Sequence, residues 1–324
     1  FPPLSSSAGS SPASAPSGDV IGSGPVRVGL ILPLSSTNGG AAAKAMRNAA
    51  EMALAEFNST DLTILVKDDR GTPEGAQAAT QEAIAQGAEA ILGPLFAPTV
   101  QAAASVARAS SRPVIAFSSD AGVASRGVYL LSFMPQSDVR RVLEYAGRKG
   151  KKSYAALIPS TSYGSVAEAE FTQTVTQMGA RMVAVERYQP NKASAEAAVA
   201  KIKASASQID ALFIPDDGNG IPVIGSVLQN AGLSRAQLLG TGVWDEATVL
   251  RTPGVQGGWY AAPERTGYQN FSQRYRQRFN ADPTRIATLS YDATALVSAL
   301  ARTQGSKRFS EPVLLNASGF SGQD

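Results

Sequence analysis

Residues 26–57 read VRVGLILPLSSTNGGAAAKAMRNAAEMALAEF, and this stretch carries the pattern that decides the fold. Its first eight residues, VRVGLILP, form a continuous apolar run, which is typical of strands buried on both faces of a parallel sheet. A polar segment, SSTNGG, follows at 35–40. The rest predicts a helix whose apolar face is formed by Met46, Ala50, Ala53, Leu54 and Phe57. The stretch therefore predicts one strand–helix unit.

The same unit recurs along the chain in two groups. Further apolar segments lie at 62–69, 88–93, 113–117 and 128–133 in the first group, and at 153–159, 181–188, 210–215 and 237–242 in the second. Helical patterns separate most of them. Gly87, Gly179 and Gly232 each stand at a predicted helix end, where glycine readily adopts the left-handed conformation. Alternating strands and helices predict parallel sheets with right-handed crossovers and helices on both faces.

Two interruptions, at Pro135 and around 259–267, mark the boundaries between the groups. The segment after the second interruption contains only helical patterns. Such helices need a sheet to cover, and we expect them to cover the sheet formed by the first group of strands. We therefore expect an α/β fold of two doubly wound parallel-sheet lobes joined by a multi-strand hinge, which suits rigid-body closure. The predicted bounds are 26–134 plus 265–305 for lobe one and 135–264 plus 306–324 for lobe two.

The first 25 residues, FPPLSSSAGSSPASAPSGDVIGSGP, are dominated by Ser, Pro, Ala and Gly. Such a segment buries too little apolar surface to offset its ordering entropy. Two interpretations stay open: a disordered tail, or a flexible tether between a membrane anchor and the folded body, as in exported lipoproteins. Because the chain does not start with Met, we interpret it as a mature or trimmed product. No apolar run is long enough to predict a membrane span.

Composition argues against several classes of function. The 324 residues include no cysteine and no histidine, which removes disulfides, thiol nucleophiles, the commonest zinc ligands and the usual general base. The net charge of +3 comes from scattered basic residues rather than the concentrated stripe of a nucleic-acid-binding protein. No nucleophile elbow, phosphate-binding loop or dinucleotide fingerprint is found. We therefore expect no catalysis, no metal, no cofactor and no nucleic-acid partner.

Ligands of parallel α/β sheets bind beyond the carboxyl ends of the strands, so the loops there supply the candidate site residues. Lobe one contributes Ser35, Phe96, Ala97, Ser118, Ser119 and Asp120. Lobe two contributes Tyr163, Asp217, Trp244 and Asp245. Hydroxyls and helix N–H groups in lobe one favour an anionic group such as a carboxylate. The aromatic pair and the carboxylates of lobe two favour an apolar body and a cationic group.

Several segments resemble the type I periplasmic solute-binding proteins, especially their leucine/isoleucine/valine-binding branch. They are VRVGLILPLS (26–35), KDDRGTPEGAQAATQEAIAQGAEAILGPL (67–95), RPVIAFSSD (112–120), Tyr163–Gly164 after ALIP, and FNADPTRIATLSYDATALVSAL (279–300). The resemblance covers nearly all of residues 26–302. It implies a monomeric periplasmic receptor, with or without a lipid anchor, that closes on a small amino-acid-like or carboxylate ligand and delivers it to the permease of an ABC transporter.

The resemblance carries over to the ligand positions only in part. Ser118, Ser119 and Tyr163 match positions that meet the ligand in the family. Ala97, however, stands where relatives commonly have a hydroxyl residue, and Gly242 stands where amino-acid binders have an acid for the ammonium group. An aliphatic amino acid would lack these partners unless Asp217 or Asp245 substitutes.

An alternative function also stays open. The segments LILPLS, ILGPLF and LLGTGVWDE are similar to some lipoprotein activators of penicillin-binding proteins, which use the same fold and act in peptidoglycan synthesis. That interpretation predicts a partner-binding outer surface in place of a filled site. An enzyme is the third and weakest candidate, since no nucleophile–base set is visible.

Overall fold

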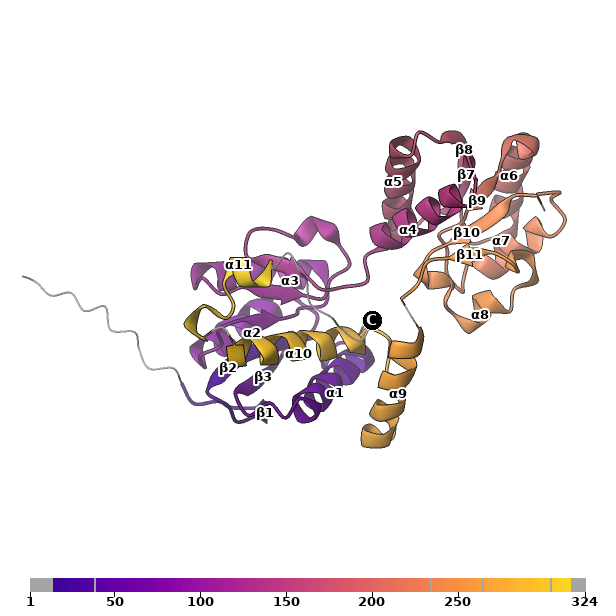
Figure 1. The fold of residues 1–324 in the computed structure, drawn as a ribbon. Helices are drawn as coiled ribbons and strands as arrows, with labels where there is room; N and C mark the ends of the chain where they lie inside the picture. Colours follow the sequence, from indigo (N-terminus) through magenta and orange to yellow (C-terminus); the bar gives the residue numbers. More distant parts are fainter. Residues whose placement is uncertain (1–13, 38, 234, 264, 304, 316–324) are drawn as a thin grey trace, which may run out of the picture. The chain divides into compact units, whose positions relative to one another are not determined.

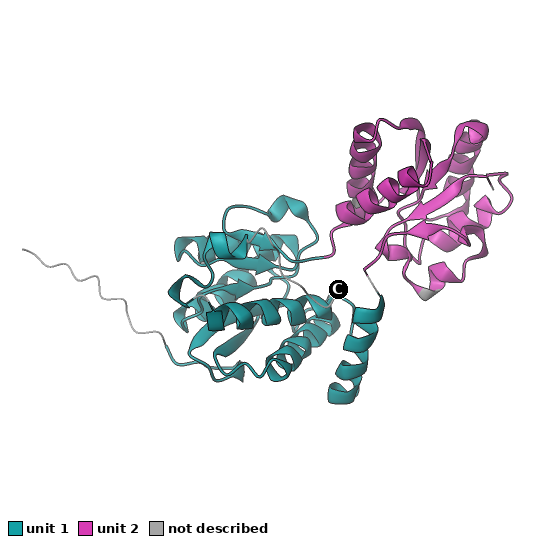
Figure 2. Cartoon of the chain, viewed as in Figure 1, with its two compact units in different colours: residues 1–132, 264–324 teal, residues 133–263 magenta. Residues whose placement is uncertain are grey.

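The computed structural model describes residues 14–315 except 38, 234, 264 and 304, and it divides into two compact units (Figure 2). Unit 1 comprises residues 1–132 and 264–324, and unit 2 comprises residues 133–263. The chain therefore passes between the units twice, after residue 132 and after residue 263. Both units are α/β, as the alternating pattern predicts, and each has its own sheet (Figure 1).

Unit 1 is built on a six-stranded sheet in the order β1-β3-β2-β4-β5-β6. The strands are β1 (Asp19–Gly22), β2 (Val26–Leu32), β3 (Leu62–Asp68), β4 (Ile91–Leu92), β5 (Val114–Ala116) and β6 (Val128–Leu130). All neighbours pair in parallel except β1, which runs antiparallel to β3. The side chain of Ile31 packs with α2 (Pro73–Ala85) and α3 (Ala97–Ala109) on one face. Since side chains alternate along a strand, Leu30 and Leu32 face the opposite side.

A second helical group of unit 1 comes from both ends of the chain. It contains α1 (Gly40–Glu56), α9 (Arg265–Phe279) and α10 (Ala287–Thr303), and α1 packs closely against α10 (Figure 1). Phe271, Tyr275 and Tyr291 form a buried aromatic cluster between these helices. The C-terminal helices α9 and α10 therefore belong to unit 1, where they pack against α1.

Two of the predicted domain boundaries are wrong. The tether was expected to reach Pro25, but Asp19–Gly22 form β1 on the edge of the sheet. Lobe two was expected to include 306–324, but the part of this segment that the structure describes belongs to unit 1. The reason is local packing, because Phe309 is buried and Arg308 lies 3.7 Å from the carboxylate of Glu89. The remainder of the predicted tether, residues 1–13, lies outside the described residues.

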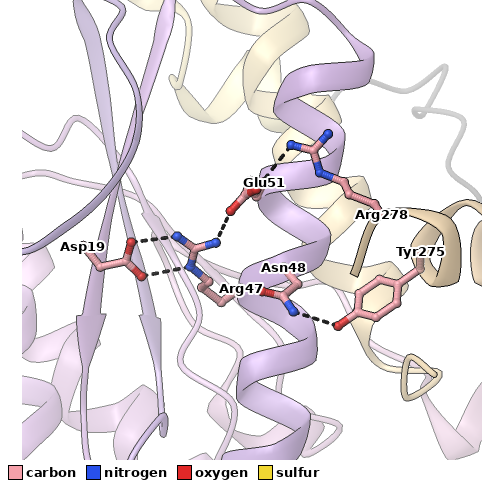
Figure 3. Close-up of polar contacts among 6 residues, drawn as sticks. All are labelled: Asp19, Arg47, Asn48, Glu51, Tyr275 and Arg278. Carbon is pink, nitrogen blue, oxygen red and sulfur yellow. Dashed lines mark hydrogen bonds and ion pairs between the residues drawn. The ribbon is translucent and has the colours of Figure 1, made fainter. Parts of the chain in front are cut away.

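Ion pairs fasten β1 and α9 to α1 (Figure 3). The guanidinium of Arg47 on α1 donates to both carboxylate oxygens of Asp19, at 2.9 and 2.8 Å, and also to Glu51. Glu51 in turn accepts a bond of 3.2 Å from Arg278 on α9. A bidentate Arg–carboxylate pair within a network is the arrangement in which surface ion pairs contribute most to stability. Together with the pairing of β1 to β3 and the burial of Ile21, this network holds β1 on the edge of the sheet.

Unit 2 is built on a five-stranded, all-parallel sheet in the order β11-β10-β9-β7-β8. Its strands are β7 (Ser153–Pro159), β8 (Arg181–Tyr188), β9 (Ala211–Phe213), β10 (Gln237–Gly240) and β11 (Trp259–Tyr260). Helices α4 (Pro135–Arg148) and α5 (Ser162–Gln177) pack on one face, where the rings of Phe171 and Phe213 stack at 5.3 Å. Helices α6 (Lys192–Lys203) and α7 (Ile221–Leu228) pack on the other.

Short elements complete the described chain. They are the α-helical turns α8 (Ala247–Leu250) and α11 (Glu311–Leu314) and the 3₁₀ turns η1 (Ala121–Val123), η2 (Ala206–Gln208), η3 (Gly242–Trp244), η4 (Pro253–Val255) and η5 (Gly305–Lys307). The three predicted glycine caps are confirmed, with φ of 87° at Gly87, 63° at Gly179 and 72° at Gly232. Pro135, at the predicted boundary between the two groups, opens α4, where its missing N–H costs nothing.

We predict that Arg47→Ala weakens unit 1 by roughly 1 kcal/mol, because Asp19 and Glu51 lose their shared partner. Amide hydrogen exchange should accelerate in β1 and in the β3 residues paired with it. Arg276→Ala is the matched control, since the pair of Arg276 with Asp282 joins side chains that are 60% and 77% exposed. Equal protection of β1 in both variants would contradict the anchoring role of Arg47.

Candidate functional site

The carboxyl ends of β7, β9 and β10 enclose a cavity of about 300 Å³ within unit 2, which we call the unit 2 hollow. Three prolines, Val243 and Tyr163 line its apolar side. Thr161, Asp216, Asp217 and Asn219 line its polar side. An apolar cavity with a few polar groups at strand ends is the usual form of a small-molecule site in α/β proteins.

Tyr163 lies in the first turn of α5. Thr161 caps this helix by accepting a bond of 3.0 Å from the Gly164 amide. The phenol oxygen of Tyr163 lies 2.6 Å from the hydroxyl of the buried Thr241. Burial, together with the nearby charge of Asp138, raises the pKa of Tyr163 to about 12, although the bond to Thr241 opposes the shift. The side chain is therefore a fixed, neutral phenol that presents its ring to the unit 2 hollow.

Asp216 is the most buried polar group of the unit 2 hollow, with 8% of the residue exposed. The Tyr188 hydroxyl donates to Oδ2 at 2.5 Å, and the Asp217 amide donates to Oδ1 at 2.9 Å. Burial outweighs these bonds and raises the pKa of Asp216. Gly220 is required here, because a Cβ at that position would lie 1.8 Å from Oδ2. Our candidate residues included Asp217 but not Asp216, although the acidic pair at a strand end was visible in the sequence.

Asp217 lies exposed at the rim of the unit 2 hollow. Its carboxylate accepts bonds from the amide and side chain of Asn219, at 2.9 and 3.3 Å, in a local turn. The side chain thus remains next to the cavity while it shapes the loop before α7. The structure brings Tyr163 and Asp217 to one cavity, as expected for neighbouring strand ends.

The expected role of Trp244 is wrong. Its indole is only 2% exposed and belongs to the core of unit 2, where its N–H donates to the carbonyl of Ile214 at 2.9 Å. Gly240 makes room for the ring, since a Cβ there would approach it to 2.1 Å. Asp245, the following residue, accepts a bond of 3.0 Å from the Tyr260 hydroxyl on β11. Both residues tie the β10 loop to the sheet instead of lining the cavity.

In unit 1 the loops after β2, β3 and β4 meet around Phe96. A Cβ on Gly39 would lie 2.8 Å from the Phe96 ring, and one on Gly71 would lie 3.7 Å from it. Both glycines have positive φ, 93° and 72°, so the loops approach the ring through backbone alone. The exposed Ser35 joins the same group, because its amide donates to Asp68 at 3.3 Å. Ala97, the first residue of α3, is half-buried beside Phe96.

The loop after β5 holds the other unit 1 candidates. Ser118 is 4% exposed, and its hydroxyl accepts a bond of 3.1 Å from the Asp120 amide. Asp120 caps the short η1 turn through a bond of 2.8 Å from the Gly122 amide. Ser119 and Asp120 are exposed and free of the core, so they are the members of this group that a ligand can reach. The Ser118 hydroxyl instead stabilises the turn by accepting the Asp120 amide.

Two adjacent aspartates end β3 in opposite electrostatic environments. Asp69 is fully buried; it accepts a bond of 2.7 Å from the Gly71 amide, and its second oxygen has no partner among the described residues. Burial raises the pKa of Asp69 to about 6. Burial would also raise the pKa of Asp68, but hydrogen bonds from Ser35, Arg70 and Leu34 outweigh it and lower that pKa.

The sequence profile of the family described as periplasmic binding protein matches residues 25–315. The chain belongs to this family. Periplasmic binding proteins are solute-binding proteins, and membership implies a location outside the cytoplasm. No curated protein matches the sequence. Among the described residues, no helix is long and apolar enough to cross a membrane.

Solved structures of similar proteins show the same fold at low identity. A Rhodospirillum rubrum protein, provisionally assigned as a branched-chain amino acid ABC transporter, is 18% identical with a TM-score of 0.80 over 92% of this chain and 91% of its own. A Rhodopseudomonas palustris solute-binding protein, in complex with 3,4-dihydroxybenzoic acid, is 21% identical with a TM-score of 0.60 over 85% and 80%. LivJ of Streptococcus pneumoniae, in complex with isoleucine, is 18% identical with a TM-score of 0.57 over 85% and 83%.

We predict that Trp244→Ala lowers the free energy of unfolding by about 3–5 kcal/mol, because it empties a packed site and removes the indole hydrogen bond to the Ile214 carbonyl. Trp259→Ala is the control, since that side chain is half-buried on the edge strand β11 and should cost less. Denaturant unfolding measures both values. An unchanged midpoint for Trp244→Ala would place the indole outside the core.

The two β3 aspartates should give opposite pH dependences of stability. Asp69 has a folded pKa of about 6 against an ordinary 3.8, so the stability it contributes is complete below pH 3.8 and is lost as the pH rises through 6. Over this pH interval the free energy of unfolding of Asp69→Asn should therefore rise relative to that of the parent protein, by up to about 3 kcal/mol. Asp68→Asn should become less stable than the parent protein as the pH rises from acid values, because the lowered pKa of Asp68 means that its ionised form stabilises the fold. Parallel curves for both variants would contradict this assignment.

Proposed function

We propose that this periplasmic binding protein captures a small solute at the carboxyl ends of its strands and delivers it to the permease of an ABC transporter. The observation that carries the proposal is the unit 2 hollow, in which a neutral phenol and two carboxylates surround a cavity with apolar walls. A cavity of about 300 Å³ suits a ligand of the size of an amino acid or a small aromatic acid. The neighbours in complex with isoleucine and dihydroxybenzoic acid support this size class.

The strand-end loops of unit 1 are the second part of the proposed site. Ser35, Phe96, Ala97, Ser119 and Asp120 lie on loops that follow β2, β4 and β5. Three of these residues are exposed, and the loops of Gly39 and Gly71 converge on the aromatic ring of Phe96. We propose that the solute engages both sets of loops and that the two chain crossings allow the units to close on it.

Binding rather than catalysis is the role that the unit 2 hollow favours. The Tyr163 phenol, with a pKa of about 12, keeps its proton at neutral pH. Asp216 and Asp217 each hold fixed hydrogen bonds to their own loops and strands. Groups that are held in this way orient a ligand and do not supply an activated nucleophile.

A thermal-shift and calorimetric screen against amino acids, amines, small carboxylates and aromatic acids tests the proposal. A true ligand at about 100 times its dissociation constant should stabilise the protein by about 2.7 kcal/mol. Tyr163→Ala should abolish this gain while the unliganded protein stays folded. Tyr145→Ala is the control, because Tyr145 is 41% exposed on α4 and packs on Trp259 away from the hollow.

A flat screen would contradict the transport proposal. If the same protein then captured a purified penicillin-binding protein, the activator function would replace it. Small-angle scattering adds an independent readout, since a ligand that closes the units should reduce the radius of gyration. A ligand that binds equally well to Tyr163→Ala and to the parent protein would remove the unit 2 hollow from the proposed site.

A further inference from the structure

We propose that the amino edge of the unit 2 sheet is a membrane-contact surface, where a row of cationic side chains binds the phosphate headgroups of an anionic lipid bilayer. This surface lies at the end of the strands opposite to the unit 2 hollow, and its action needs no solute. The proposal therefore goes beyond solute capture and does not depend on it.

Basic residues from four separate segments of the chain come together at this edge. The strands of unit 2 are all parallel, so the segments that lead into them reach the same edge of the sheet. All but one of the basic residues are exposed, and Lys151 is half-buried. We call the set the basic edge: Arg148, Lys149, Lys151, Lys152, Arg181, Lys203 and Arg235.

Backbone hydrogen bonds hold the entries to four of the strands side by side. The Arg181 amide donates to the Lys152 carbonyl at 2.9 Å, and the Lys152 amide donates to Oδ2 of Asp210 at 2.9 Å. The Asp210 carbonyl in turn accepts a bond of 2.9 Å from the Gln237 amide at the start of β10. Neighbouring strands are spaced by roughly 5 Å, so these four entries form a row of roughly 15 Å. The basic edge is therefore a continuous row of cations.

The positive charge of the basic edge is largely unneutralised. The segments that lead into the five strands contain a single acidic residue, Asp210, within 149–152, 178–180, 204–210, 229–236 and 251–258. Arg148 lies 3.9 Å from Glu144, but the two side chains are 66% and 48% exposed, so the pair is weak. Among the described residues, no other member of the basic edge forms an ion pair. A net positive charge therefore faces solvent along the whole row.

Aromatic side chains beside the row are the second observation that points to a lipid surface. Tyr145, near the end of α4, is 41% exposed, and the Lys149 ammonium lies 5.5 Å from its ring centroid. Trp259, the first residue of β11, meets the Tyr145 ring edge-on at 5.2 Å. Tyrosine and tryptophan combine an apolar body with a polar tip and favour the headgroup level of a bilayer. Cations and aromatic rings thus share one surface.

The side-chain types favour lipid headgroups over a single anion of fixed shape. Four of the seven members of the basic edge are lysines. Lysine is a point charge on a flexible stem and suits phosphates that move within a fluid layer, whereas the recognition of one rigid anion favours the planar fork of arginine. The permease of the proposed transport system also resides in a membrane, so a bilayer is the anionic surface that the protein would approach.

Co-sedimentation of the full chain with vesicles tests the proposal. We expect binding to vesicles of equal parts phosphatidylcholine and phosphatidylglycerol, no binding to phosphatidylcholine alone, and a loss of binding as the salt concentration rises. Each basic residue close to an anionic bilayer contributes about fivefold to the affinity. Replacement of Lys149, Lys151 and Lys152 together by Gln should therefore lower the affinity for the vesicles by roughly a hundredfold.

A matched variant removes the same charge from the other end of unit 2. Arg141 in α4, Arg187 near the end of β8 and Lys192 at the start of α6 are exposed and lie towards the carboxyl ends of the strands. Their joint replacement by Gln should leave the vesicle affinity within a few-fold of the parent protein. Tyr145→Ala should weaken vesicle binding several-fold, and Tyr145→Trp should preserve it, because the aromatic ring remains.

Three outcomes would overturn the proposal. The first is no binding to the anionic vesicles at low salt. The second is an equal loss in both triple variants, which would mean that net charge acts without the basic edge. The third is tight binding of soluble poly-L-glutamate together with no binding to vesicles, which would make the partner an acidic polypeptide. Solute binding is measured separately, so failure here leaves the proposed function in place.

Discussion

The backbone N–H and C=O groups of a strand that is buried on both faces cannot form hydrogen bonds with water. Each inner strand must therefore pair with neighbouring strands of the sheet. Residues Leu30 to Leu32 of β2 and Ala155 to Leu157 of β7 are fully buried, and both strands have parallel neighbours on each side. Parallel pairing requires a helical crossover after each strand, and every crossover begins at the same edge. The loops that carry Tyr163, Asp216 and Val243 are brought together by this constraint, although they are far apart in the sequence.

The architecture could be read from the sequence because it depends on repeated local patterns. Apolar runs, glycine caps and amphipathic helices each predict an element, and they agree on two parallel sheets. The departures come from interactions between distant residues. Asp19 opens the four-residue strand DVIG within a Ser- and Gly-rich segment and is held by Arg47, and Phe309 is buried in unit 1 after a segment with no clear pattern. Neither contact has a signature within a short window of sequence.

The site was predictable at the level of loops and not of side chains. Tyr163 and Asp217 lie at the expected cavity, because strand ends fix where a loop begins. Which of two adjacent aspartates turns inward depends on the Asn219 turn and on the space that Gly220 leaves, and both are visible only in three dimensions. Trp244 was chosen for its aromatic character and its loop, yet the room beside Gly240 draws the ring into the core.

The burial of Trp244 has a practical consequence for optical work on this protein. The chain has two tryptophans, Trp244 and Trp259, and both lie in unit 2. The Trp244 indole is hydrogen-bonded to Ile214, two residues before Asp216, so its emission should respond to changes in that loop. Unit 1 contains only tyrosine and phenylalanine as aromatic residues. Excitation at the red edge of the protein absorption band, where only tryptophan absorbs, would therefore report on unit 2 and give no signal from unit 1.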